Sequence, residues 1–501
     1  MNFDISKEEF LRLAQETPVM IQLMARLKTD RSPLEVYTAL NKKYAYLLES
    51  VEKEKKHARF SFVGAEPDVI ITIKNRRVSL DYACSNSMVQ FIKNSLSRVC
   101  HADGSIKAGF DTMDALRAAF VASDVRFIGN RFERQAFLCG AIGFCAYDMV
   151  YDCWLDIPPK KSSIPDAQFA ITTRSIVFDH LTDDTYVVIT PFVDDDPEKV
   201  YLEAKMEANK LASLIKSAKP FMVRKNMPQA IRCNMEKEEY KDAVRKAKQY
   251  IINGDIFQVV LSRRYEIITD QSPIELYAVL RKVNPSPYMY LFEFDDVSII
   301  GASPETLLTV YKRKVITNPI AGSSPRGETP EQDEEFAKSM LRSEKERAEH
   351  VMLVDLGRND VRMVSKGGSV KVEDFMSVLK YSHVQHIEST VSGLLRDDCD
   401  AFDATRAIFP AGTLSGAPKI RAMEIIHELE KDARGIYGGG VGYYSWNGDA
   451  DFAIVIRTII KNGRTAIVQA GAGIVADSDP EYEYNETERK MAAMIKAIGG
   501  V

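Results

Sequence analysis

The sequence predicts an α+β fold in which large antiparallel β-sheets carry most of the core. Strand-like segments occur as neighbouring pairs, as in residues 297–320, and they do not alternate regularly with helices. No internal repeat of fixed period is present. The 501 residues allow two or three domains, or one large domain with insertions, and a hydrophobic content of 45% is ordinary for a globular enzyme.

The N-terminal part shows helical and strand-like patterns in turn. Residues 1–30 have the spacing of an amphipathic helix, and residues 44–80 alternate as strands do. Further along we expect a helix, a buried strand entering a helix, a hairpin and a long helix, at residues 112–122, 137–150, 175–192 and 197–217. Residues 218–234 are basic, contain proline and lack a clear pattern. We therefore place the main boundary there and divide the chain into regions 1–220 and 235–495.

After this boundary, residues 238–252 predict a helix that Asn253 and Gly254 stop, with a strand behind it. The remainder mixes helices with paired strands.

Composition argues against several classes of protein. Lys+Arg 66 against Asp+Glu 71 gives a net charge of −5, which disfavours binding to nucleic acid or to a membrane surface. No apolar run is long enough to span a bilayer, and the N-terminus lacks the pattern of a signal peptide. The seven cysteines are scattered without a CxxC pair, as is typical of reduced thiols in a cytoplasmic protein. Neither a dinucleotide-binding nor a nucleoside-triphosphate motif is present.

Two acidic segments are the first candidates for chemistry. Residues 343–360, SEKERAEHVMLVDLGRND, predict a helix that Gly357 ends. Glu346 and Glu349 are three residues apart and share one side of this helix. Taken alone, such a face is more often simply solvated.

A second helix is expected after Pro480, in DPEYEYNETERK. Glu483 and Glu486 repeat the spacing of three, although Glu486 can also pair with Lys490 on the surface. Two helices that each present carboxylates can hold Mg²⁺, which prefers one or two carboxylates and completes its shell with water and an anionic substrate.

Segments rich in glycine and small residues lie between and beside these helices, at residues 319–327, 409–419, 434–442 and 468–473. Exposed backbone N–H groups in the first of these, predicted as a loop, can bind a carboxylate. Thr413 and Ser415 precede a helix, where their hydroxyls suit an anion or act only as N-caps. Arg457 ends an apolar strand and is costly to bury without an anion, for which a protein carboxylate is the commoner partner.

His383 and His386 are predicted to lie on opposite faces of one strand, so that only one can face a site. A core or surface histidine is the usual outcome, and a general base is the functional alternative. Together these elements describe a Mg²⁺-dependent site for a small substrate with two negative charges.

Many motifs occur in order through residues 235–495: GDIFQVVLSRR, NPSPYMYLFEF, GASPE, PIAGS, AEHVMLVDLGRND, GTLSGAPKIRAME, YGGGVGYY, DFAIVIRT, QAGAGIVADSDPE and NET. In these motifs the chain resembles the chorismate-utilising enzymes, and among them the large subunits of anthranilate synthases. The resemblance implies a sandwich of two large antiparallel sheets with helices packed outside. It also implies Mg²⁺ as cofactor and chorismate as substrate.

Residue roles are implied by the same motifs. Glu349 and Glu486 correspond to the Mg²⁺ ligands, and the catalytic residues are the general acid Glu305, Thr413 and the base His386. The implied substrate contacts are Gly322, Ser323, Tyr437, Arg457, Gly471, Ala472 and Gly473. The family usually has threonine and then a basic residue where this chain has Ser323 and Ser324, so the detail of that segment differs.

A few positions indicate the branch of the family. Relatives that make aminodeoxychorismate or isochorismate typically carry lysine where this chain has Ala321, and alanine leaves room for ammonia. The segment LLES at residues 47–50 resembles part of a tryptophan feedback pocket, although by spacing alone it is a plain strand end. The resemblance implies a tryptophan site, contributed partly by region 1–220, that contains Glu49, Ser50, Pro287, Tyr288 and Met289.

The ammonia is expected from a separate glutamine amidotransferase subunit, in a heterotetramer, because no cysteine lies in a G-x-C-x-G elbow; Cys139 comes nearest. The function implied is the first step of tryptophan biosynthesis in the cytoplasm. Two alternatives are component I of aminodeoxychorismate synthase, in the folate pathway, and a non-catalytic module that senses chorismate or tryptophan. A non-catalytic module would be expected to have lost catalytic or metal-binding residues, yet the sequence retains Glu305, Glu349, His386 and Glu486.

A Ser50→Phe substitution is expected to abolish inhibition by tryptophan, because the phenyl ring fills the predicted pocket. The measurement is the tryptophan concentration that halves anthranilate formation in the variant and in the wild type. Unchanged inhibition would place the effector site elsewhere.

Overall fold

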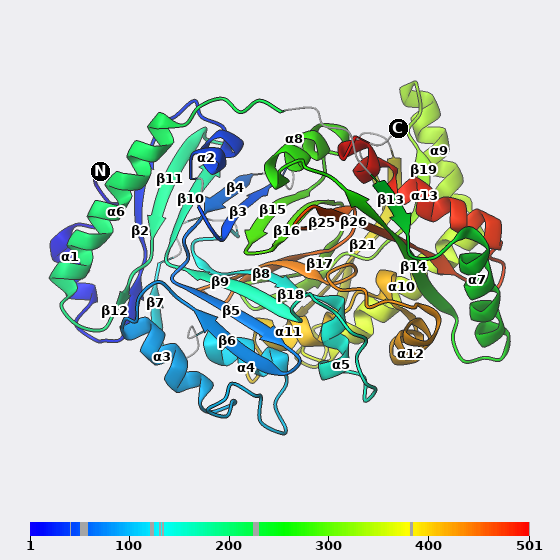
Figure 1. The fold of residues 1–501 in the computed structure, drawn as a ribbon, viewed down its shortest axis with the longest axis horizontal. Coiled ribbons are helices and arrows are strands. Elements are labelled where there is room, and N and C mark those ends of the chain that lie inside the picture. Colours follow the sequence, from blue (N-terminus) through cyan, green and yellow to red (C-terminus); the bar gives the residue numbers. More distant parts are fainter. Residues whose placement is uncertain are drawn as a thin grey trace.

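The computed structural model describes residues 1–40, 42–50, 59–120, 125–129, 132, 135–223, 230–380 and 384–499, except for the side chain of Ser323. Two large β-sheets face each other, and helices cover their outer sides (Figure 1). Every strand pair in these two sheets is antiparallel. The predicted α+β sandwich is confirmed.

The larger sheet has twelve strands in the described part of the chain. Its order is β13-β14-β26-β25-β16-β15-β3-β4-β10-β11-β2, with β22 beside β14. In that order the strands are Ala230–Cys233, Gln258–Ile268, Thr465–Ile474, Thr458–Asn462, Val297–Ser303, Tyr288–Phe294, Ala45–Glu49, Phe60–Gly64, Arg174–Asp179, Asp184–Ile189 and Leu23–Leu27, and β22 is Gly416–Ala417.

The second sheet has eleven described strands in the order β19-β21-β18-β17-β24-β23-β8-β9-β5-β6, with β20 beside β21. They are Ile320–Pro325, Val384–Leu394, Lys314–Thr317, Thr306–Tyr311, Ala450–Ile454, Gly440–Ser445, Gly140–Cys145, Ala167–Thr172, Val69–Lys74 and Arg77–Asp81, and β20 is Lys371–Lys380. A small third sheet contains β12 (Phe192–Val193), β1 (Val19–Ile21) and β7 (Arg126–Ile128).

Regions 1–220 and 235–495 contribute strands to both large sheets. In the first sheet β3 pairs with β15, and in the second β8 pairs with β23. The boundary inferred from composition therefore separates two stretches of sequence that are joined through continuous hydrogen-bonded sheets.

The helices are α1 to α13, and most of them pack on the outer faces of the two large sheets (Figure 1). Their bounds are Lys7–Leu13, Pro33–Leu40, Ser87–Leu96, Thr112–Ala119, Val150–Cys153, Pro197–Ser217, Lys237–Ile252, Pro273–Val283, Pro330–Arg342, Glu344–Arg362, Ala401–Ile408, Lys419–Leu429 and Pro480–Ala497. The expected helices at 112–122, 197–217 and 238–252 are confirmed as α4, α6 and α7, with α4 ending at Ala119, and the hairpin of β10 and β11 is confirmed as well.

The sheet core follows the two-residue period of strands. Leu291 packs under the helices α2, α6, α8 and α13, whereas its neighbour Phe292 faces the space between the sheets. In β23, Tyr443 packs against Phe62 and Tyr444 stacks on Phe402 of α11, with ring centroids 4.1 Å apart. Alternation thus supplies both the inner layer and the helix-covered outer layers.

The prediction of a helix over residues 1–30 is wrong beyond residue 13. There α1 ends, and Val19–Ile21 and Leu23–Leu27 form β1 and β2. These strands pair with β12, β7 and β11. Long-range pairing of a short apolar segment here outweighs its helical periodicity.

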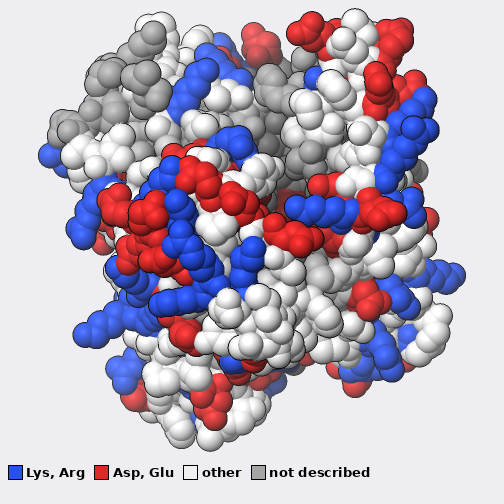
Figure 2. Space-filling model, turned by 90° about the vertical axis from the view of Figure 1, so that its right-hand side faces the viewer, with Lys and Arg blue, Asp and Glu red and all other residues white. Residues whose placement is uncertain are grey.

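The distribution of charged side chains on the surface and the state of the cysteines agree with what the composition predicts. Lys and Arg are interspersed with Asp and Glu on the face shown in Figure 2, without an extended region of one sign. Among the described helices, none combines the length and apolar character needed to cross a bilayer. All seven cysteines are free thiols.

A reciprocal pair of aspartates and arginines ties α4 to α11. Asp111, the N-cap of α4, accepts hydrogen bonds from Arg406 at 2.7 and 2.8 Å. Asp400, the N-cap of α11, accepts from Arg117 of α4 at 2.8 and 3.1 Å. Burial alone would raise the pKa of Asp111, but the Arg406 guanidinium holds it below its usual value. Each carboxylate therefore caps one helix and binds the other.

An Arg406→Gln substitution is expected to lower the free energy of unfolding by about 1–3 kcal/mol, because it leaves a half-buried carboxylate without its cation. Since the pKa of Asp111 is lowered in the folded state, this contribution is present at neutral pH and is lost as the pH falls below about 4. Urea denaturation at pH 7 and at pH 3 measures both effects. Arg12→Gln, at a 68% exposed side chain, is the control and should change stability by less than about 0.5 kcal/mol.

Candidate active site

Helix α10 carries the first pair of carboxylates. Ser343 caps it and accepts a hydrogen bond from the backbone N–H of Glu346, and the helix runs on to Arg362. The predicted end at Gly357 is therefore wrong. A Cβ on Gly357 would lie 3.3 Å from side-chain atoms of Pro319 and Thr317, so this glycine lets α10 pack closely on the second sheet.

Helix α13 carries the second pair, as predicted, and Asp479 is its N-cap. Glu486 does pair with Lys490, with Oε1 and Nζ 2.6 Å apart, but Lys490 has a second partner in the first sheet. The same ammonium donates to the carbonyl of Gly471 in β26 at 2.9 Å. Lys490 thus joins the acidic helix to a strand of the first sheet.

The carboxylates of the two helices converge. Burial raises the pKa of Glu349, and the neighbouring charges of Glu346 and Glu486 raise it further. Glu349 Oε1 lies 4.0 Å from the point where a Cβ on Gly473 would stand. Negative charge therefore accumulates between α10 and β26, where a cation would relieve it.

The segment predicted as a loop over residues 319–327 is instead mostly β19, which pairs with β21. The register shifts between Ala321 and Ser324, and Gly322 lies there with a φ of +65°. This irregularity frees the carbonyl of Gly322, which accepts a hydrogen bond from His386 Nδ1 at 2.6 Å. A glycine suits the position because left-handed backbone strains other residues.

His386 is held by the carbonyl of Gly322, and its surroundings favour the neutral imidazole. Burial lowers its pKa, and the positive charges of Arg457 and Lys490 act in the same direction. With Nδ1 donating to Gly322, the neutral tautomer carries its lone pair on Nε2. The predicted alternative, His383, lies outside the described residues.

Glu305 is a buried carboxyl group at the end of β16. Burial raises its pKa to about 7, against the opposing effects of the Thr413 hydroxyl and the Lys490 charge. Thr413 Oγ1 donates to Glu305 Oε1 at 2.8 Å. Thr413 itself lies in a short 3-10 turn, Gly412–Leu414, ahead of α12. Glu305 is thus protonated near neutral pH, as a general acid must be.

Arg457 lies between β24 and β25 with a φ of +51°, a strained conformation for a residue with a side chain. Its guanidinium donates to the carbonyl of Lys490 at 2.6 Å, and burial lowers its pKa. Within the described part of the chain, no carboxylate forms an ion pair with it. A half-buried guanidinium with no carboxylate partner among the described residues is arranged for an anionic ligand.

Tyr437 and the glycines of β26 complete the site. A Cβ on Gly471 would lie 3.0 Å from the Tyr437 hydroxyl, and a Cβ on Gly473 would lie 2.6 Å from Gln258 Nε2. At Gly471 a side chain would also meet the backbone carbonyl of Leu261 at 2.8 Å, at Gly473 it would displace the end of the Gln258 side chain, and Ala472 between them is buried. The strand therefore presents bare backbone beside Arg457, as predicted.

No group of three or more His, Cys, Asp or Glu side chains capable of holding a metal ion occurs among the described residues. Glu349 and Glu486 offer two carboxylates, which suits an ion such as Mg²⁺ that takes most ligands from water and an anionic substrate. The raised pKa of Glu349 fits this donor set, because a bound cation would favour its charged form.

A family model described as chorismate binding enzyme matches residues 110–496. The chain belongs to the chorismate binding enzyme family. An anthranilate synthase component 1 of Haloarcula marismortui is 47% identical over 99% of this chain and 96% of that relative. One from Thermococcus kodakarensis is 43% identical, covering 93% of this chain and 97% of the relative.

Solved structures agree. Anthranilate synthase component I of Streptococcus pneumoniae superposes with a TM-score of 0.71 at 33% identity, over 94% of this chain and 99% of that one. The menaquinone-specific isochorismate synthase of Escherichia coli shares the fold, with a TM-score of 0.68, 17% identity and 98% coverage of both chains. The predicted membership of the chorismate-utilising enzymes is confirmed.

The residues predicted for tryptophan fall on two faces of the first sheet. Glu49 and Met289 are register partners on the helix-covered face, where Glu49 accepts from Tyr277 at 2.6 Å and from Arg281 at 3.0 Å. Tyr288 points between the sheets, and its hydroxyl lies 3.0 Å from both Asp451 and Thr306. Ser50 follows β3, and Pro287 precedes β15. Their role in binding tryptophan stays a prediction.

Two residues of the site were not predicted. Lys490 was identified by its spacing from Glu486 but was interpreted only as a surface partner. Gln258 is 3% exposed, and its Oε1 has no hydrogen-bond partner among the described residues. The sequence did contain a signal for Gln258: its side-chain amide stands at the start of a strand whose next residues, VVL, are apolar. Ser323 was predicted to contact substrate; its backbone lies in β19, and its side chain is outside the described set.

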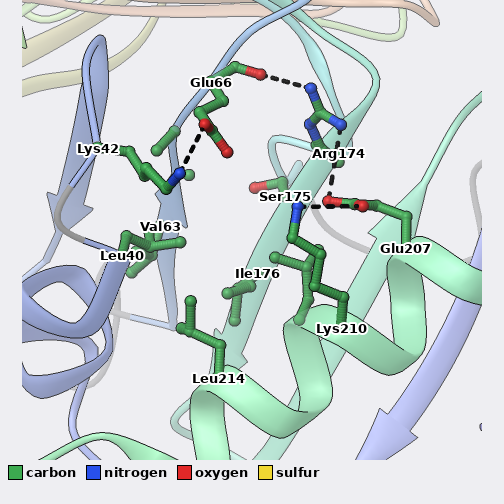
Figure 3. Close-up of a pocket in the computed structure, with 13 residues that line it drawn as sticks. Leu40, Lys42, Val63, Glu66, Arg174, Ser175, Ile176, Glu207, Lys210 and Leu214 are labelled. Atoms are coloured by element: carbon green, nitrogen blue, oxygen red, sulfur yellow. Dashed lines mark hydrogen bonds and ion pairs between the residues drawn. The ribbon is translucent and has the colours of Figure 1, made fainter.

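A separate cavity lies between α6 and the first sheet (Figure 3). The volume open to the centres of water molecules inside this cavity is about 40 Å³, which is room for a few waters. The charges at its rim pair with one another: Lys42 with Glu66 at 3.0 Å, and Arg174 with Glu207 at 3.6 Å. It contains none of the predicted site residues.

Proposed function

We propose that this chain is the large subunit of an anthranilate synthase, which converts chorismate and ammonia to anthranilate, pyruvate and water. The observation that carries the proposal is that the site combines a buried carboxyl group with a raised pKa, Glu305, and an imidazole with a lowered pKa, His386, which is close enough to Arg457 for its charge to act on it. The names of relatives that are 43% and 47% identical support it. Pyruvate formation and ammonia addition would together make the ring aromatic.

Substrate binding is assigned to the cationic side of the site. The two carboxylates of chorismate would meet the Arg457 guanidinium, the Tyr437 hydroxyl and the backbone of Gly471 to Gly473. Lys490 adds a second positive charge and already donates to Gly471. These groups are fixed before substrate arrives, so little reorganisation opposes binding.

Glu305 would start the chemistry by donating its proton to the ring hydroxyl, which then leaves as water. A cavity beside Glu305 and Thr413 offers about 30 Å³ to the centres of water molecules, enough for the departing water. Ammonia adds to the ring, and His386 Nε2 removes the ring proton as the enolpyruvyl group leaves. That group gains a proton and becomes pyruvate.

Glu349 and Glu486 would hold Mg²⁺, which when bound neutralises a substrate carboxylate and polarises it as a Lewis acid. The two side chains come from different helices, so the ion would also fix α13 relative to α10. Lys490 would then exchange part of its contact with Glu486 for contact with substrate.

The nearest alternative, component I of aminodeoxychorismate synthase, differs in retaining the enolpyruvyl group. Ala321, which is 8% exposed and provides no amine, favours anthranilate synthase. A non-catalytic sensing module would not need the matched acid and base. We also propose feedback inhibition by tryptophan, an amidotransferase partner and a cytoplasmic location, which the seven free thiols support.

The direct test is the fluorescence of anthranilate formed by the purified chain from chorismate, Mg²⁺ and ammonium. Product is expected with the wild type, and a chelator or Glu486→Ala should reduce the rate at least about 100-fold. Lys366→Ala, at an exposed surface ion pair, is the control and should retain full activity. Consumption of chorismate without anthranilate would favour aminodeoxychorismate or isochorismate formation; intact chorismate would favour a sensing module.

The alkaline limb of kcat/KM is expected near pH 7, because activity falls as Glu305 loses its proton. The Thr413 hydroxyl lowers the pKa of Glu305, so Thr413→Val should move this limb to higher pH. Thr413→Ser keeps the hydroxyl and should leave the limb in place. A pH profile of kcat/KM for the three proteins decides; an unmoved limb in Thr413→Val would show that another group titrates.

A further inference from the structure

The cavity beside Glu305 and Thr413 extends to a second buried carboxyl group, that of Asp360. We call it the Glu305 cavity. The volume open to the centres of water molecules inside it is about 30 Å³, which is room for about two waters. Thr317 and Asn318 add polar atoms to its wall, so water inside it finds hydrogen-bond partners. Among the described residues that line the cavity, Glu305 and Asp360 are the only ones with an ionisable side chain.

Asp360 is bonded through one of its two carboxylate oxygens. It lies in the last turn of α10, and its Oδ2 accepts a hydrogen bond from Lys419 Nζ at 2.7 Å. The same ammonium donates to the carbonyl of Ile408 at 3.0 Å. In the described part of the chain no residue bonds Asp360 Oδ1, which leaves this oxygen for water. The side chains of Asp360 and Lys419 are each 8% exposed, so the ion pair also borders on solvent.

The two carboxyl groups at the ends of the cavity bind a proton with similar affinity. Burial raises the pKa of Asp360 to about 6, against the opposing charge of Lys419. Burial raises the pKa of Glu305 to about 7; the Lys490 charge opposes that rise, and the Glu388 charge adds to it. A proton therefore moves between Asp360 and Glu305 at little cost in free energy.

The proposed reaction requires that Glu305 regain a proton in every turnover. When Glu305 donates, the C–O bond of the ring hydroxyl breaks, and water leaves with the bonding electrons. The nitrogen that adds to the ring releases a proton to solvent, and Glu305 remains as a carboxylate. Among the described residues that line the Glu305 cavity, none is a substrate contact assigned above. The cavity thus offers a route to Glu305 that bound substrate does not need.

We propose that Asp360 returns the proton to Glu305 through water in the Glu305 cavity. The O–H bond of Asp360 breaks and its proton passes to a water, which gives one of its own protons to the Glu305 carboxylate. Solvent then protonates Asp360 again from the exposed side of its ion pair with Lys419, so no other co-reactant is needed. The inference rests on the proposed function and extends it with the step that restores the acid.

The test compares the first turnover of the full chain with later ones, by rapid mixing with chorismate, Mg²⁺ and ammonium at about pH 6, where Glu305 starts protonated. Asp360→Asn has an amide that cannot supply the proton. Its first equivalent of anthranilate should form within about twofold of the wild-type rate, and later turnovers should be about 10–100-fold slower than in the wild type. Added formate buffer at constant pH should speed these later turnovers, because a small acid replaces Asp360, and should leave the wild type unchanged.

Two further variants separate proton return from a structural role of the ion pair. Lys419→Met breaks the same pair but keeps the acid, so its later turnovers should slow less than about threefold, whereas a structural role predicts equal losses in both single variants. If Asp360→Asn fails to fold because Lys419 is left buried and unpaired, the double variant Asp360→Asn/Lys419→Met buries no charge and still decides. Asp355→Asn, at a 62% exposed carboxylate of the same helix, is the matched control and should change neither phase.

Later turnovers that are no slower relative to the first than in the wild type, in Asp360→Asn and in the double variant, would overturn the proposal. If the wild type makes no anthranilate, the proposed function fails, and consumption of chorismate in the same experiment tests the proton return instead. If chorismate also stays intact, infrared spectroscopy decides. The carboxyl C=O band that Glu305→Gln removes should shift in Asp360→Asn, because the same waters bond both groups, and an unshifted band would contradict the link.

Discussion

The Lys490 ammonium is the charge on which the rest of the site depends. It pairs with Glu486 at 2.6 Å, donates to Gly471 at 2.9 Å, and opposes the rise in pKa that burial causes at Glu305, Glu349 and Glu483. Lys490 can reach Gly471 only if α13 packs on the first sheet in a single position along its axis. Arg263, fully buried in β14, fixes that position: it bonds Glu488 and Thr487 of α13 and stacks 4.5 Å from the ring of Tyr484. The buried guanidinium of Arg263 thus fixes α13, and α13 in turn positions the ammonium of Lys490.

Burial also explains why Glu305 and His386 suit the different roles proposed for them, an acid and a base. Burial disfavours charge on any group, so it raises the pKa of Glu305 to about 7 and lowers the pKa of His386. The two shifts have one physical cause and opposite chemical results, since the first leaves a proton to give and the second leaves a lone pair to receive one. The charges of Lys490 and Arg457 both lower the pKa of His386 further, whereas the Lys490 charge opposes the rise in the pKa of Glu305. The hydrogen bond from Thr413 also opposes it, which keeps Glu305 from becoming too weak an acid to donate.

Sequence reasoning predicted most of the fold because the pattern was strong where tertiary pairing agreed with it, as in α6 and the β10–β11 hairpin. It failed where long-range contacts decide. Residues 19–27 form strands only because β7, β11 and β12 accept them, and Gly357 lies inside a helix because Pro319 and Thr317 approach it. Motifs located the site residues, but they could not show that Arg457 has no carboxylate partner among the described residues. They also could not show that Gly322 orients His386, because neither contact is local in sequence.

The same limit applies to the residues predicted to bind tryptophan, which come from two segments, LLES at residues 47–50 and residues 287–289, and which the structure divides between two faces of the first sheet. Glu49 is held by Tyr277 and Arg281 under α8, whereas Tyr288 reaches across the sandwich to Asp451 and Thr306. Thr306, the first residue of β17, directly follows Glu305, which lies in the connection from β16 of the first sheet to β17 of the second; the Tyr288 hydroxyl is therefore hydrogen-bonded one residue from Glu305. An effector changes activity only if it contacts two states of the protein differently. Both sheets contain strands from regions 1–220 and 235–495, and the hydrogen bond between Tyr288 and Thr306 links β15 to the residue after Glu305, so contact between the two sheets here does not cross a boundary between separate domains.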